Sequence, residues 1–162
     1  MPATSVRRRT WAAYTAAWLA GIFAAISVYW ALGGMIGINT VGGDIAAMAK
    51  SGTVTAFLMA WGAAVMKAAG VVFALALVQR WGRVFPRWLM LGAGWLAAVV
   101  LTAYGVINVA LEFVVTVGIM AVPNGADLYA LHWHLWLWDP LFAVWGILLA
   151  IALVHYRTNP QR

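Results

Sequence analysis

The chain has 162 residues, of which 65% are hydrophobic and only 9% are charged, and its mean hydropathy is +0.91. This composition excludes a soluble globular domain, because a core of this size cannot hide so much apolar surface, and it indicates an integral membrane protein. The chain has no cysteine, which excludes a disulfide framework, a thiolate nucleophile and a cysteine metal site.

All the arginines lie in three short clusters, at residues 7–9, 80–87 and 157–162, whereas Asp44, Asp127 and Asp139 fall between the clusters. Short flanks rich in arginine mark the cytoplasmic side of a membrane. We therefore expect a single all-α domain over residues 1–162, a polytopic bundle of four transmembrane helices with both termini inside. The net charge of +6 is then explained by contact with anionic lipid, and no nucleic-acid partner is expected.

The first predicted span covers residues 11–32. Arg7, Arg8 and Arg9 resemble a twin-arginine signal, but the apolar run is longer than the roughly 7–15 residues of a signal-peptide core, so a signal anchor is expected. Tyr29, near the end of this span, belongs by default to the aromatic belt at the outer interface. The alternative is that Tyr29 lines a headgroup pocket together with polar residues of later spans.

The second predicted span covers residues 53–78 and contains Lys67 near its middle. An ammonium group at this depth costs about 2.5–3.5 kcal/mol, so it needs water or a partner. The residues that share a helix face with Lys67 are mostly small: Ala56, Ala60, Ala63, Ala64, Gly70, Val71 and Ala74. We therefore expect Lys67 to point into the bundle, where it lines a polar cavity or, alternatively, forms a buried pair that fixes helix register.

The third predicted span, residues 88–121, is longer than the roughly 20 residues that cross a bilayer. It is expected to tilt, to kink near Gly105 or to extend beyond the outer surface. Asn108 and Glu112 share a stripe with small residues, which predicts that Glu112 faces inward. At 1.5 Å per residue, Lys67 lies about 18 Å and Glu112 about 36 Å from the inner helix ends, so their direct pairing stays open. Tyr104 and Asn108 are nearer acceptors for Lys67.

The last predicted span has two alternative starts. It covers residues 140–155 if Asp139 is the N-cap and Pro140 the first helical residue. Otherwise it begins near Leu131 and Pro140 kinks it.

Histidine and tryptophan are concentrated just before this span. If the segment is extended, His132 and His134 share a face and could bind a divalent metal with Asp139, Asp127 or Glu112; on a helix they point about 160° apart. The favoured interpretation is an interfacial aromatic belt, so no metal is expected. No haem or other cofactor is expected either, because the first three spans contain no histidine.

Two short motifs carry a resemblance to a known family. They are Val28-Tyr29-Trp30-Ala31-Leu32-Gly33-Gly34 at the end of the first span and Leu137-Trp138-Asp139-Pro140 at the start of the last. With these motifs the chain resembles a bacterial family of small four-helix integral membrane proteins of unknown function. The resemblance implies the same four-helix architecture and no activity. The expected location is multi-pass in the plasma membrane, the inner membrane of a bacterium.

Three functions are consistent with these residues. The favoured one is a lipid or small-amphipath binding protein, or an accessory subunit, with an outward-facing polar cavity; its membrane partners would be lipids, a lipidic ligand and other copies or subunits. The residues expected to line this cavity are Lys67, Tyr104, Asn108, Glu112, Tyr29, His134 and Asp139. The second function is a membrane enzyme in which Glu112 or His134 is the acid or base and Lys67 stabilises negative charge. The third is a proton-coupled transporter with a relay from Lys67 to Glu112.

Overall fold

The computed structural model describes residues 3–122 and 125–158, and within them it contains helices and turns but no strand. The helices are α1 (Ala3–Ala31), α2 (Gly43–Lys50), α3 (Val54–Ala76), α4 (Arg87–Thr116), α5 (Leu128–Trp133) and α6 (Asp139–Arg157). Two 3-10 turns, η1 (Ile38–Val41) and η2 (Arg80–Val84), and one π-turn, η3 (His134–Trp138), join them.

Four stretches are long and apolar enough to cross a membrane: Thr10–Ala31, Val54–Ala76, Arg87–Thr116 and Leu128–Arg157, the last running through α5, η3 and α6. Thus the predicted all-α fold with four membrane-spanning helices is confirmed.

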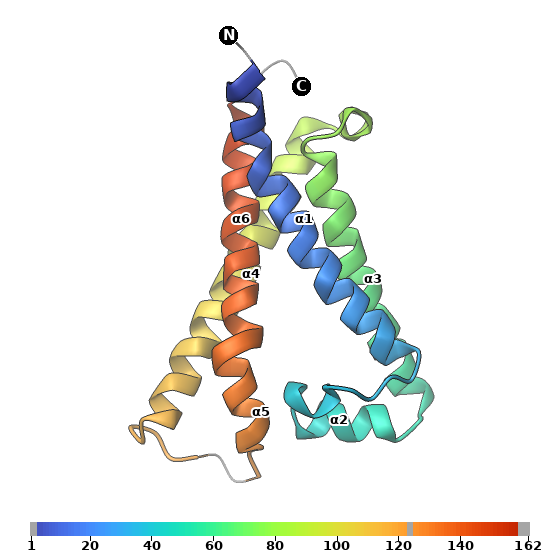
Figure 1. Cartoon of the computed structure of the whole chain (residues 1–162), viewed down its shortest axis with the longest axis vertical. Helices are drawn as coiled ribbons and strands as arrows, with labels where there is room; N and C mark the ends of the chain where they lie inside the picture. The colour runs from blue at the N-terminus through green and yellow to red at the C-terminus, as the bar shows by residue number, and fades with distance from the viewer. Residues whose placement is uncertain (1–2, 123–124, 159–162) are drawn as a thin grey trace.

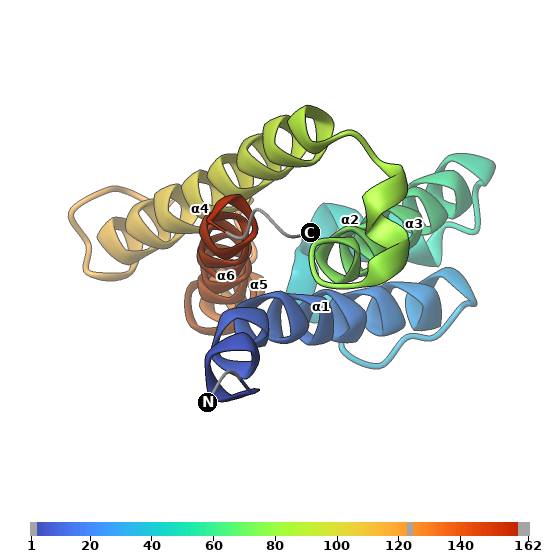
Figure 2. The same ribbon diagram turned by 90° about the horizontal axis from the view of Figure 1, so that it is seen from above.

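The four spans form two pairs that share a contact. α1 packs along α3, α4 packs along α6, and α1 also packs against α6. Seen from above, α6 lies between α1 and α4 (Figure 2). The spans lie close together at the end that holds η2 and the end of α6, which we call the basic end, and they diverge toward the end that holds α2 (Figure 1). The segment from η1 to α2 lies at this opposite end.

Small residues allow the close approach of α4 and α6. A Cβ atom on Gly105 of α4 would collide with the backbone of Asp139 and Ala143, and one on Gly146 of α6 would collide with Ala98 and Thr102. Backbones that approach this closely are typical of helix contacts in membranes, where packing replaces the hydrophobic drive. Gly105 therefore serves a helix contact.

The third span is shorter than predicted. α4 ends at Thr116, and the predicted continuation to residue 121 is wrong, because Gly118 adopts a positive φ of 76° and the N–H of Ile119 donates back to Val114 O at 2.9 Å. This is the glycine-terminated C-cap that commonly ends a helix.

The last span begins earlier than Pro140. Asp127 is the N-cap of α5, where its Oδ1 accepts hydrogen bonds from the N–H groups of Tyr129 and Ala130 at 3.0 and 3.2 Å. The interpretation of Asp139 as an N-cap is therefore wrong, and the alternative with an earlier start is the better one. The helix passes Pro140, which has no N–H, directly after the π-turn.

Candidate functional site

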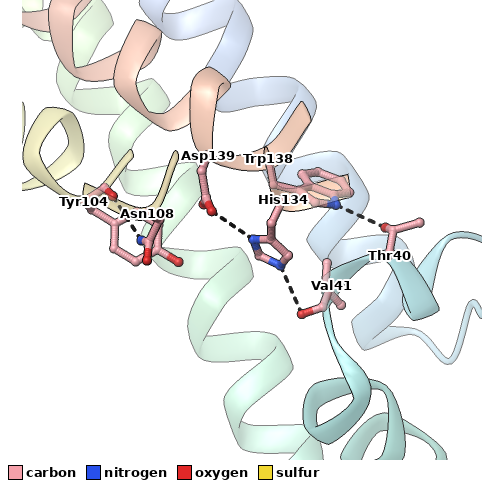
Figure 3. A network of polar contacts seen from close by, with 7 residues as sticks. All are labelled: Thr40, Val41, Tyr104, Asn108, His134, Trp138 and Asp139. Carbon is pink, nitrogen blue, oxygen red and sulfur yellow. Dashed lines mark hydrogen bonds and ion pairs between the residues drawn. The ribbon is translucent and has the colours of Figure 1, made fainter. Parts of the chain in front are cut away.

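Three titratable side chains converge where α4 meets the last span. His134 Nδ1 lies 3.1 Å from Asp139 Oδ2, and one ligand atom from each of Glu112, His134 and Asp139 lies within 4.8 Å of the other two. Asp139 is only 1% exposed, whereas Glu112 and His134 are partly buried. We call Glu112, His134 and Asp139 the polar cluster; Figure 3 shows its His134 and Asp139 with their hydrogen-bond partners.

The π-turn brings His134 and Asp139 together. In a regular α-helix, two residues five positions apart point about 140° away from each other. In a π-turn the hydrogen bonds run between residues five apart, so these residues lie nearly above one another. The N–H of Asp139 donates to His134 O in this pattern. The π-turn thus places the imidazole and the carboxylate on the same side of one helix.

η1 holds the other edge of the His134 ring. His134 Nε2 lies 3.2 Å from Val41 O, and because a carbonyl only accepts hydrogen bonds, Nε2 carries a proton in this arrangement. Beside it, Trp138 Nε1 donates to Thr40 Oγ1 at 3.1 Å (Figure 3). Glycines at both ends of η1, with φ values of 76° and 114°, allow the chain to turn there. η1 therefore fixes the orientation of the ring.

Two carboxylate oxygens of the polar cluster, Glu112 Oε2 and Asp139 Oδ1, are buried and have no hydrogen-bond partner among the described residues. Buried acceptors are normally paired, since leaving one unpaired costs free energy. Among the side chains that the structure describes, the ion pair of Asp139 is with His134, and no lysine or arginine pairs with either carboxylate. The cluster is thus suited to a partner that supplies positive charge or hydrogen-bond donors.

Tyr104 and Asn108 lie on α4, two turns and one turn before Glu112. Asn108 Nδ2 donates to Tyr104 O at 3.0 Å, and the Tyr104 ring meets Phe142 edge to face, with centroids 5.4 Å apart. In the view of Figure 3 both residues lie on the side of Asp139 away from His134. Tyr104 is 47% exposed, so it borders the cluster at the surface of the bundle.

Lys67 lies away from the polar cluster. Its Nζ donates to Ser27 Oγ at 2.7 Å and lies 5.9 Å from the centroid of the Phe23 ring, and both partners belong to α1. α3, which contains Lys67, shares few contacts with α4. Lys67 thus points into the bundle, but its pairing with Glu112, which the sequence left open, is not formed, and neither Tyr104 nor Asn108 accepts from it.

Tyr29 also lies outside the polar cluster, in a local turn that explains the first motif. Tyr29 OH accepts from the N–H of Ile36 at 3.2 Å, and Trp30 Nε1 donates to Ile36 O at 2.9 Å. A Cβ atom on Gly34 would collide with the Tyr29 ring. These contacts show that Tyr29 orders the turn after α1. Its hydroxyl bonds within this turn and not to Glu112 or His134.

The alternative of an extended segment, in which His132 and His134 share a face, is not formed, because the segment is helical. His132 is exposed, and its ring centroid lies 6.5 Å from that of Trp136. An extended segment would have put both imidazoles on one face, whereas the helix separates them. His134 alone joins the carboxylates.

A cavity of about 300 Å³ lies at the basic end, far along the spans from the polar cluster. Its lining includes Gln79, Arg83, Arg87 and Tyr156. The outward-facing polar cavity expected at the opposite end stays a prediction.

Sequence reasoning missed the contribution of η1. Val41 O and Thr40 Oγ1 contact residues more than 90 positions later in the chain. The local indication was the glycines on both sides of it, Gly37 before and Gly42 and Gly43 after, which are typical of tight turns.

Comparison with known proteins gives one match. A family model described as a protein of unknown function (DUF3995) matches residues 20–149, a range that includes Lys67 and the whole polar cluster. No curated protein and no solved structure matches the chain.

Proposed function

The chain belongs to the DUF3995 family of proteins of unknown function, and from its polar cluster we propose that it binds the polar headgroup of a lipid or small amphipath. The headgroup would contact Glu112 and Asp139, and the apolar tail would lie along α4. The observation that carries this proposal is the pair of buried carboxylate oxygens without partners, Glu112 Oε2 and Asp139 Oδ1. These atoms accept hydrogen bonds, so a headgroup with N–H or O–H donors, or with a positive charge, satisfies them.

The neighbourhood of the polar cluster supports an amphipathic ligand. Tyr104, two turns before Glu112 on α4, is half exposed, and Leu111 and Phe113, which flank Glu112 in the chain, are exposed apolar residues. A site with a few fixed polar groups next to apolar surface is the usual composition of a small-molecule site.

Membrane location and partners form part of the proposal. The arginines at the basic end favour a multi-pass protein of a bacterial plasma membrane with this end in the cytoplasm. In the most apolar stretches of α3 and α4, only 11% of the residues are buried. Wide apolar faces of these helices are therefore left for lipid or for a further subunit.

The test measures the ligand that the protein retains. The protein is purified in mild detergent, and the bound amphipaths are extracted and identified by mass spectrometry. We expect one class of amphipath to be retained, and Glu112→Gln and Asp139→Asn to reduce its retention by about tenfold, since each weakens a charge-assisted hydrogen bond. His132→Gln is the matched control on the same helix. Equal retention by all four proteins, with helix content unchanged, would refute the proposal.

A membrane enzyme is the second candidate. Glu112 and His134 offer an acid and a base within 4.8 Å of each other, and acid–base catalysis needs two such groups near one reacting centre. In this case the retained amphipath would be converted by the wild-type protein and left intact by Glu112→Gln. The transporter hypothesis is less well supported, because Lys67 bonds to Ser27 and its proposed relay partner lies on another helix pair.

A further inference from the structure

We propose that the polar cluster is a divalent metal site of the zinc type, with Glu112, His134 and Asp139 as its protein ligands. The three ligand atoms lie within 4.8 Å of one another. Around a tetrahedral ion with bonds of about 2.1 Å, ligand atoms are separated by about 3.4 Å. Glu112 is only partly buried, so its side chain has room to rotate toward this distance.

The hydrogen bond of His134 to η1 is the second observation. A histidine that binds a metal through one nitrogen almost always donates the other N–H to a carboxylate or a backbone carbonyl. His134 Nε2 faces Val41 O at 3.2 Å, and Nδ1 faces the carboxylate of Asp139 at 3.1 Å. Nδ1 is therefore directed toward the position of the ion, and Val41 already supplies the supporting contact.

Charge and burial favour the same ligand. Asp139 is 1% exposed, its Oδ1 and Glu112 Oε2 have no hydrogen-bond partner among the described residues, and no described lysine or arginine pairs with them. Binding of the ion displaces the protons of its ligands, and the two carboxylates and the neutral imidazole then carry a charge of about −2, which a divalent ion cancels within the apolar interior. An ion held by the polar cluster would thus supply the positive charge that these two carboxylates lack.

The ligand types select the class of ion. One imidazole nitrogen and two carboxylates suit zinc, manganese or iron(II), whereas calcium takes six to eight oxygens and copper(I) prefers sulfur. Three protein ligands leave a coordination position open, as in catalytic zinc sites. This position would be available to water or to a headgroup oxygen.

The test uses the metal alone. The full-length protein, purified without a histidine tag and stripped with EDTA, is titrated with Zn²⁺ and, for an optical signal, with Co²⁺. We expect about one ion per chain, a visible Co²⁺ spectrum, and at least about tenfold weaker binding in Glu112→Gln and in His134→Gln. His132→Gln, which removes an exposed histidine two residues away, should bind as the wild type does.

Three results would overturn the metal site: a wild-type protein with unchanged helix content that binds no ion, equal binding by all variants, or equal loss in His132→Gln. Glu112→Gln replaces a partly exposed side chain by one of the same shape, so circular dichroism separates loss of ligation from loss of folding. Excess Mg²⁺ or Ca²⁺ that displaces Co²⁺ would overturn the assignment of the ion to the zinc type.

Coordination of a headgroup by this ion rests on the proposed function, and the two fail separately. If EDTA releases the retained amphipath and Zn²⁺ restores its binding, the ion contacts the headgroup. If the amphipath stays bound after EDTA while the stripped protein still takes up Zn²⁺, coordination of the headgroup is refuted and both binding activities stand. If Zn²⁺ binds and no amphipath is ever retained, the proposed function fails and the metal site stands.

Discussion

His134 and Asp139 are five positions apart in the chain, yet Nδ1 of the one lies 3.1 Å from Oδ2 of the other. A π-turn makes this contact possible, and the same turn leads into Pro140. Around this pair α4 supplies Glu112, and η1 supplies the carbonyl of Val41. The site thus depends on the packing of three segments that are distant in sequence.

Gly105→Ala should destabilise the protein. The added methyl group meets the backbone of Asp139 and Ala143, which cannot move aside as a flexible side chain could. Overpacking of this kind costs about 1–3 kcal/mol. Gly92→Ala is the matched control on α4, because its Cβ would have no neighbour within 4 Å, and it should be neutral or stabilise by up to about 1 kcal/mol. Thermal unfolding in detergent measures both, and equal melting temperatures for the two variants would contradict a close backbone contact at Gly105.

Trp138→Phe should remove the hydrogen bond that joins η3 to η1. The bond from Trp138 Nε1 to Thr40 Oγ1 lies between buried residues, and its loss should cost about 1 kcal/mol beyond the change in packing. The measurement is a double-mutant cycle with Thr40→Val. A coupling energy close to zero would mean that the bond does not stabilise the fold.

Asp127→Ala should destabilise the start of the last span by about 1 kcal/mol, because two backbone N–H groups lose their acceptor. Asp127→Asn keeps a side-chain oxygen at the N-cap and should retain most of the stability. Hydrogen exchange of the first turn of α5 provides a local readout. Faster exchange in Asp127→Asn as well as in Asp127→Ala would mean that the charge of Asp127, and not its capping hydrogen bonds, stabilises this turn.

Lys67→Met should leave the retained amphipath and the bound metal unchanged. Lys67 bonds to Ser27 on α1, so its removal does not alter the polar cluster. The free energy of unfolding should change by no more than about 1 kcal/mol, since the lost hydrogen bond is offset by removal of a charge from the membrane interior. Ala68→Met, on the exposed face of α3, is the control. Loss of the retained amphipath in Lys67→Met but not in Ala68→Met would indicate a functional link between Lys67 and Glu112.

The sequence by itself determined the class of fold. Long apolar stretches must form helices in a membrane, since every backbone polar group needs a partner within its own segment. Small residues on one face predicted which way Lys67 and Glu112 point. Helix ends were predicted less well, because Gly118 and Asp127 act through local backbone geometry that hydropathy does not report.

The tertiary structure alone decided which polar residues meet. Lys67 and Glu112 both face inward, but α3 packs on α1 and α4 packs on α6, so the two charges are separated. His134 reaches Asp139 because one π-turn changes the helical phase, and it reaches Val41 because η1 folds back across 93 positions. Periodicity assigns a residue to a face of its own helix, whereas the choice of neighbouring helix depends on the packing of side chains from every span at once.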